Sequence, residues 1–345
     1  MAPGASPPFL QACLRRPVPF TPIWLMRQAG RYMPEYRAVR ARLGFLELCK
    51  NPEAAAEVTL QPVERLGVDA AILFADILLV LEPLGVGLEF TRGDGPRIGR
   101  PVRSREAALA LPHIDVDDAL GFVYETVARV RKVLADRVPL IGFAGAPFTL
   151  ASYLIEGGPS REFLLTKAFM RREPAAWAAM MTRLADVTAD YLNGQIAAGA
   201  QAVQLFDSWV GALSPADYRA YVLPHTRRVM QALRPGAPVI HFGVGTGGLL
   251  PLMREAGGDV IGLDWRVELG PTWARLGHDV AVQGNLDPAV LLSDVDAIRL
   301  AAREILDAAA GRPGHVFNLG HGIHKETPIE HVRALVDIVH ELSAR

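Results

Sequence analysis

Two arginines near the N-terminus have the spacing expected of an anion-binding site. In PIWLMRQAGRYMPEYR, Arg27 and Arg31 are four residues apart, so a helical turn would place them on one side. Gly30 lies beside Arg31 and would let the backbone approach a ligand closely. A guanidinium binds carboxylates through paired N–H donors, so several arginines together suit a multiply carboxylated ligand. A solvated helix face is the alternative explanation.

A carboxylate stands where apolar residues are expected. Asp76 interrupts the run LFADILLVLEPLG, and burial of an unpaired charge is costly, so this side chain needs partners. It could form a buried ion pair or cap a helix. If the arginines lie nearby, it could instead be an anion held ready for a cationic ligand or for N–H donors.

Polar residues also follow later apolar runs. Tyr153 lies in GAPFTLASY, Ser208 in QLFDS and His321 in NLGHG. Each has an ordinary structural explanation, since a buried tyrosine packs its ring and bonds its hydroxyl, and a lone histidine is commonly structural. No Gly-x-Ser-x-Gly motif surrounds Ser208, which favours a hydrogen-bond donor over a nucleophile. A histidine between glycines at a strand end favours a ligand contact.

These residues follow short apolar runs that are typical of buried parallel strands. Helical patterns separate the runs; Ser214 with Pro215 predicts one helix start, and Gly199 predicts a helix end. The fold class predicted is therefore α/β, as a single (β/α)8 barrel. The eight predicted strands are 22–26, 70–76, 139–145, 202–208, 238–244, 259–265, 280–286 and 315–322.

An open doubly wound sheet is the competing architecture. The segment GVGTGG at 243–248 superficially resembles a dinucleotide-binding loop. No acidic residue follows about 20 positions later in the setting that a nucleotide site requires.

In a barrel, the loops after the strand C-termini form the active site, so residues at the strand ends should converge on one mouth. The residues expected there are Arg27, Arg31, Asp76, Tyr153, Asp207, Ser208, His241, Asp264, Asn285 and His321.

Composition limits the function classes. The chain has 345 residues, with 36 Lys and Arg against 37 Asp and Glu, which argues against a nucleic-acid binder. Two cysteines do not make a disulfide scaffold. No apolar run reaches the roughly 18 residues of a membrane span, and no signal peptide is recognisable. We expect a cytoplasmic protein without a membrane partner, with a flexible N-terminal arm over 1–20 and a catalytic domain over 21–345.

Five motifs, in order along the chain, resemble those of the uroporphyrinogen decarboxylase family. They are RQAGRYMPEYR, FADILLVLEPLG, GAPFTLASYLIEGG, QLFDSWVG, and NLGHGI with TPIEHV. The resemblance runs from about Pro22 to the C-terminus. It implies a homodimeric (β/α)8 barrel that uses no cofactor or metal. The activity implied is decarboxylation of the four acetate side chains of uroporphyrinogen III, which gives coproporphyrinogen III in tetrapyrrole (haem) biosynthesis.

The resemblance also implies roles for individual residues. Arg27 and Arg31 would bind substrate carboxylates. Because the substrate brings eight carboxylates, we expect Arg40 to help offset their lost solvation. Asp76 would contact the pyrrole N–H groups. Tyr153, Ser208 and His321 match further binding-site residues of the family.

The chemistry explains why such a site needs no cofactor. Protonation of a pyrrole carbon beside the acetate makes a cationic ring, and the electrons of the departing carboxylate flow into it. A fixed carboxylate stabilises that cation, and Asp76 is the candidate. Arg27 either positions a carboxylate or water, or takes a direct part; the proton donor stays open, because arginine is a poor acid.

Two other functions are considered. A corrinoid-linked methyltransferase shares this barrel family but binds zinc through cysteines at the strand ends. Here the only cysteines, Cys13 and Cys49, precede those places, which disfavours it. A tetrapyrrole carrier would need the arginines but not a central Asp76.

Overall fold

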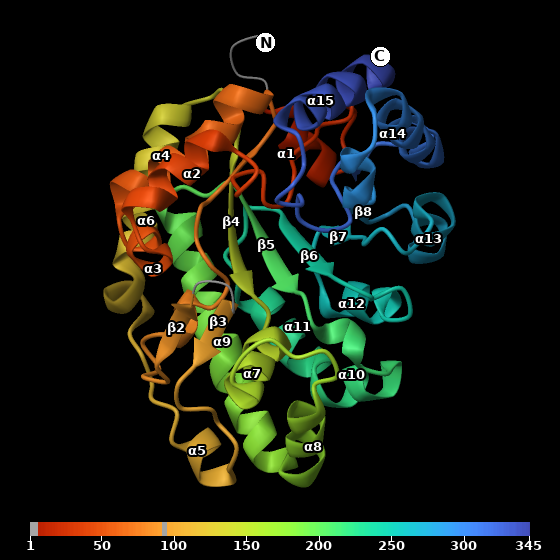
Figure 1. The fold of residues 1–345 in the computed structure, drawn as a ribbon. Helices are drawn as coiled ribbons and strands as arrows, with labels where there is room; N and C mark the ends of the chain where they lie inside the picture. The colour runs from red at the N-terminus through yellow and green to blue at the C-terminus, as the bar shows by residue number, and fades with distance from the viewer. Residues whose placement is uncertain (1–5, 92–94) are drawn as a thin grey trace.

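A curled parallel sheet forms the centre of the chain (Figure 1). The computed structural model describes residues 6–91 and 95–345. Within them seven parallel strands follow one another across the sheet in the order β1-β4-β5-β6-β7-β8-β9. The strands are β1 (Ala71–Ile72), β4 (Leu140–Gly145), β5 (Ala202–Asp207), β6 (Val239–Gly243), β7 (Val260–Gly262), β8 (Ala281–Gln283) and β9 (His315–Val316).

Helices surround the sheet, and helices alternate with the strands along most of the sequence, which confirms the predicted α/β architecture (Figure 1). The larger helices are α4 (Pro52–Leu66), α6 (Val116–Leu134), α9 (Pro174–Ala198), α11 (Leu223–Ala232), α14 (Val295–Ala309) and α15 (Ile329–Ser343). The shorter ones are α1 (Pro8–Cys13), α2 (Pro34–Arg42), α3 (Phe45–Cys49), α5 (Arg105–Leu109), α7 (Pro147–Glu156), α8 (Leu164–Arg172), α10 (Pro215–Tyr221), α12 (Leu250–Ala256) and α13 (Leu269–Leu276). Among the described residues, no helix is both long enough and apolar enough to cross a membrane.

Local sequence sets several helix ends. The Ser214 hydroxyl accepts a hydrogen bond from the Asp217 N–H at 3.1 Å, and Pro215 takes the first position of α10. Gly199 ends α9 with a φ of 118°. Both predicted signals are confirmed.

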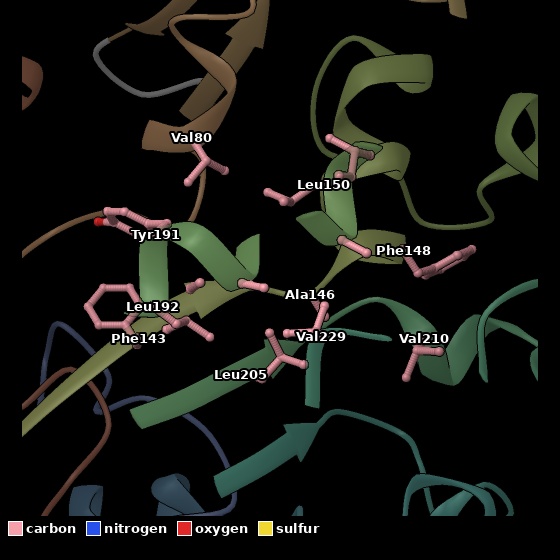
Figure 2. Close-up of a cluster of buried hydrophobic side chains, with 14 of the residues drawn as sticks. Val80, Phe143, Ala146, Phe148, Leu150, Tyr191, Leu192, Leu205, Val210 and Val229 are labelled. Carbon is pink, nitrogen blue, oxygen red and sulfur yellow. The ribbon is translucent and has the colours of Figure 1, made fainter. Parts of the chain in front are cut away.

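The two faces of the sheet bury different sets of side chains. Strand pairing sets Ile141 beside Ala202 and Ile240 beside Val260, and these residues pack together with Trp24 inside the curl. The residues between them in sequence point outward to the helices. Figure 2 shows this outer layer, where Leu205 of β5 lies in one cluster with Leu192 of α9, Val229 of α11 and Phe148 of α7.

One helix side chain takes the place of a strand. Strand β1 is short, and the chain leaves the sheet after the Leu73 N–H donates to the Ile141 carbonyl. Phe143 lies two residues after Ile141 on β4, and its backbone N–H and carbonyl point to the same side, where β1 no longer supplies partners. Gln195 of α9 supplies its partners, since Gln195 Oε1 accepts from the Phe143 N–H at 2.9 Å and Nε2 donates to the Phe143 carbonyl at 3.0 Å.

The predicted first strand, 22–26, is reduced to one bridge between Ile23 and Phe317. The Phe317 N–H donates to the Pro22 carbonyl at 2.8 Å, and the Asp69 N–H donates to the Ile23 carbonyl at 2.8 Å. The segment therefore lies between the end of β9 and the start of β1, although it does not continue as a regular strand.

Other boundaries also differ from the prediction. The strands expected over 70–76 and 315–322 are limited to β1 and β9, because their apolar residues continue into buried loops. An antiparallel hairpin of β2 (Leu88–Thr91) and β3 (Gly95–Ile98) was not predicted.

The N-terminal arm expected over 1–20 is partly packed. Helix α1 buries Phe9, Ala12 and Cys13 against residues at the start of the strands, such as Ile141 and Ala202. Residues 8–13 are therefore tied to the sheet.

Candidate functional site

The C-terminal ends of the parallel strands bring several of the proposed site residues together. In Figure 1 the arrowheads of β4, β5 and β6 point toward α7, α8 and α10. Tyr153 lies on α7, Ser208 directly follows β5, and Asp76 and His321 lie in the loops after β1 and β9.

Arg27 lies against the loop after β9. It is exposed, has a φ of 60°, and follows the buried Met26. Its side chain runs over Gly322, where a Cβ atom would come within 2.4 Å of Arg27 Cδ. Only glycine fits there without displacing the arginine. The structure therefore places Arg27 next to the His321 loop, at the junction between the two ends of the chain.

His321 is uncharged at neutral pH. Burial lowers its pKa to about 4, and the nearby cations Arg27 and Arg266 act in the same direction. Its ring meets the Trp265 ring edge-on, with centroids 5.9 Å apart. The site thus presents a neutral imidazole near two guanidinium groups.

Asp76 is a partly buried carboxylate with an unusual pKa. Burial raises the pKa to about 6, whereas a hydrogen bond from the Leu78 N–H and the charge of Arg27 oppose that rise. The Leu78 N–H donates to Asp76 Oδ1 at 2.8 Å. Asp76 is therefore held in place by the backbone, within the electrostatic reach of Arg27, and mostly ionised at pH 7.

Tyr153 lies near Asp76 on the side of α7. Its hydroxyl keeps its proton, because burial and the charge of Asp76 raise its pKa to about 12. Its ring centroid is 5.8 Å from that of Trp209. Ser208 precedes Trp209 and is partly exposed, so the β5 loop borders the same space.

Arg31 and Arg40 interact with the α2–α3 region. The Arg31 carbonyl accepts from Arg37 Nη1 at 2.9 Å. Arg40 donates to the Leu43 carbonyl, and its guanidinium carbon lies 5.6 Å from the Phe45 ring centroid. In the described residues neither arginine forms a hydrogen bond or an ion pair with Asp76.

Two residues expected at the mouth lie behind the sheet instead. Asp207 and His241 are fully buried on its outer face, where Asp207 Oδ1 accepts from Thr149 Oγ1 at 3.3 Å and His241 Nδ1 lies 3.3 Å from the Met253 carbonyl. His241 Nε2 and Asp207 Oδ2 are 3.9 Å apart. Alternate strand residues point to opposite faces, so these two face the helices, whereas Ser208 does not.

Asp264 and Asn285 support the loops of the mouth. Asp264 Oδ1 accepts from the Arg266 N–H at 3.0 Å and Oδ2 from Arg266 Nη1 at 2.9 Å. Asn285 Nδ2 donates to the carbonyls of Asp264 and Val267 at 2.8 and 2.7 Å. Both side chains are almost fully buried, so their polar groups hold the loop that follows β7.

Sequence reasoning missed Arg266. Its guanidinium carbon lies 3.7 Å from the Trp265 ring centroid, and its side chain is 52% exposed. Its position in the sequence could have identified it, because Arg266 directly follows the predicted strand 259–265, as Ser208 follows β5.

Comparison with known proteins gives a consistent result. The family described as "Uroporphyrinogen decarboxylase (URO-D)" matches residues 5–342. A uroporphyrinogen decarboxylase of Carboxydothermus hydrogenoformans is 56% identical over 337 residues, which cover 97% of this chain and 96% of that protein. One of Chloroflexus aurantiacus is 56% identical over 336 residues, or 96% and 94% of the two chains.

A solved structure supports the fold alone. A methyltransferase from Methanosarcina mazei superposes with a TM-score of 0.80 over 96% of this chain and 97% of its own, at 22% identity. The match to the family extends over nearly all of the sequence, and the relatives share more than half of their residues with it. The chain therefore belongs to the uroporphyrinogen decarboxylase family.

Proposed function

We propose that this chain is a carboxy-lyase that converts uroporphyrinogen III to coproporphyrinogen III in tetrapyrrole (haem) biosynthesis without a cofactor. The observation that carries the proposal is Asp76, a carboxylate held by the Leu78 N–H within reach of Arg27. Family membership supplies the substrate class.

Asp76 is proposed as the catalytic carboxylate. Each turnover protonates the pyrrole carbon beside an acetate, and the C–C bond to the carboxylate breaks to release carbon dioxide, so that its electrons neutralise the cationic ring. A proton then adds to the exocyclic carbon to give the methyl group, and the ring carbon loses its proton. One proton is consumed overall for each acetate. An ionised Asp76 under the ring nitrogens stabilises the cation that forms in between.

The remaining residues bind the acidic substrate. Arg27 and Arg31 are proposed to pair with its carboxylates, which would otherwise lose their solvation in the mouth. Arg40 is proposed as a further contact, although its present partners are Leu43 and Phe45. Tyr153 and the neutral His321 retain N–H or O–H donors for the ligand, and Ser208 adds a hydroxyl at the β5 loop.

Anaerobic incubation of the purified protein with uroporphyrinogen tests the proposal. We expect carbon dioxide and a series of partly decarboxylated products, without added metal or pyridoxal phosphate. A protein that binds the substrate but releases no carbon dioxide would be a carrier. A strict requirement for an added cofactor would contradict the mechanism.

The methyltransferase alternative is not favoured. It needs a thiolate to hold a metal at the mouth, whereas Cys13 lies among residues at the start of the strands. Cys49 lies on α3, and burial raises its pKa, which keeps the thiol protonated.

We further infer that the sheet closes as an eight-stranded barrel, with 21–345 as one catalytic domain and 1–20 as an arm. Hydrogen bonds of Pro22 and Ile23 to Phe317 and Asp69, on both sides of the gap between β9 and β1, support this closure. A homodimer and a cytoplasmic location are also proposed, on the resemblance described above. Analytical ultracentrifugation of the intact chain tests the dimer.

A further inference from the structure

We propose that Arg266 is an additional substrate-binding residue, which holds one of the peripheral carboxylates on the side of the mouth opposite α7. The inference rests on the proposed function, because it requires a ligand with several carboxylates.

The position of Arg266 is the first argument. It follows β7 by four residues, so it belongs to the loops that build the mouth. Trp265 connects it to His321 through the edge-on ring contact. Arg27 approaches His321 from the Gly322 side. Arg266 and Arg27 both act on the imidazole electrostatically, so both cations lie near His321.

The side chain is held in place before any ligand arrives. The Trp265 ring supports the flat face of the guanidinium at 3.7 Å, and Asp264 accepts from one of its N–H groups. Asp264 is fixed in turn by hydrogen bonds from the Gly245 and Arg266 backbone N–H groups. Little side-chain freedom remains to be lost on binding.

The loop itself is fixed from the other side. A Cβ atom on Gly320 would lie 2.1 Å from the Trp265 nitrogen, so the loop after β9 packs directly on the Trp265 backbone. Movement of Trp265 away from His321 would therefore disturb both loops.

Charge and exposure determine what Arg266 can bind. Asp264 is 2% exposed, whereas the Arg266 side chain is 52% exposed, so a ligand meets the cation and not the carboxylate behind it. The free edge of the guanidinium retains N–H donors with the geometry of a carboxylate partner. Uroporphyrinogen carries eight carboxylates, more than Arg27 and Arg31 can pair with.

The experiment measures binding and turnover separately. Parent protein, Arg266→Gln and Arg266→Lys are assayed for the equilibrium binding of uroporphyrinogen under anaerobic conditions and for kcat and KM. We expect Arg266→Gln to raise Kd and KM by about five- to tenfold while kcat stays within twofold, and Arg266→Lys to recover part of that loss. Arg299→Gln is the matched control, since Arg299 also pairs with a carboxylate, Glu341, but on the outer helices.

A second variant excludes an indirect effect. Removal of Arg266 uncovers Asp264, which could repel the substrate by itself, so Asp264→Asn is combined with Arg266→Gln. We expect the double variant to keep the raised Kd. Recovery of the parent Kd in the double variant, or an unchanged Kd in Arg266→Gln, would overturn the inference. If the parent binds uroporphyrinogen but releases no carbon dioxide, the proposed function fails while the binding role of Arg266 is still decided by Kd.

Discussion

At the scale of single residues, the charge of Asp76 is controlled by its surroundings. Burial among apolar neighbours raises its pKa to about 6, close to neutral pH. Arg27 and the Leu78 N–H keep the ionised form available. His321 titrates near pH 4 and Tyr153 near pH 12, so Asp76 alone of these three changes charge between pH 5 and 7.

This assignment predicts an acid limb in the pH profile. If the carboxylate must be ionised, kcat/KM should fall tenfold per pH unit below about 6, because protonation removes the charge that stabilises the cationic ring. Asp76→Asn should lower kcat by about 100-fold or more, with KM changed only a few-fold. Asp279→Asn, which alters an exposed ion pair with Arg254, should leave kcat and the limb unchanged. Near-normal turnover in Asp76→Asn would refute the electrostatic role.

At the scale of elements, helix α9 completes strand β4. The Gln195 amide satisfies the N–H and carbonyl of Phe143 at the edge where β1 has already ended. This contact holds α9 on the sheet just before the β4–α7 turn that leads to Tyr153.

Gln195→Ala should therefore destabilise the fold. It leaves two buried backbone groups without partners, so we expect the free energy of unfolding to fall by about 2 to 4 kcal/mol. Urea unfolding followed by circular dichroism measures the change. Gln231→Ala, on the exposed side of α11, is the control and should change stability by less than about 0.5 kcal/mol. Equal losses in the two variants would show that Gln195 has no special role.

The sequence predicts elements better than their ends. Apolar runs located the seven strands of the parallel sheet, but Phe74 and Leu319 continue the apolar pattern beyond the hydrogen-bonded ladder. Burial alone does not distinguish a strand from a buried loop. The β2–β3 hairpin was missed because residues such as Glu89 and Arg97 interrupt any apolar run.

The same reasoning applies to the site. The predicted strand ends placed Asp76 and His321 in the loops after β1 and β9 and Tyr153 just beyond β4, where the structure has α7, because parallel strands end at one edge. The prediction did not consider that successive side chains of a strand point to opposite faces of the sheet. A shift of one residue turns a side chain from the mouth to the helices. Asp207 was assigned to the mouth for that reason, and Arg266 was overlooked behind Asp264.

At the scale of the whole molecule, Asp69 connects both ends of the chain to the sheet. Its Oδ2 accepts from the Ile23 N–H at 2.7 Å, and His340 Nε2 of α15 lies 2.8 Å from the same oxygen. Burial alone would lower the pKa of His340, but the hydrogen bond and charge of Asp69 outweigh it, so the pKa is raised.

A raised pKa makes this junction dependent on pH. The stabilisation by protonated His340 is fully present below the pKa of an unfolded histidine and is lost as the pH rises through the raised value. The Tm of the parent should therefore exceed that of His340→Gln by more at pH 6 than at pH 8. His113→Gln, an exposed histidine, should show no such difference. Calorimetry that gives the same Tm gap at both pH values would contradict the prediction.

The contact of Arg27 with Gly322 has a consequence for synthesis in the cell. Arg27 leaves the ribosome long before Gly322, so this contact can form only after the loop that follows β9 has emerged. The central strands can fold earlier, but a truncated product that ends before β9 would lack the loop on which Arg27 rests. The contact between Arg27 and Gly322 therefore forms only late in synthesis, and shorter products cannot build this part of the mouth.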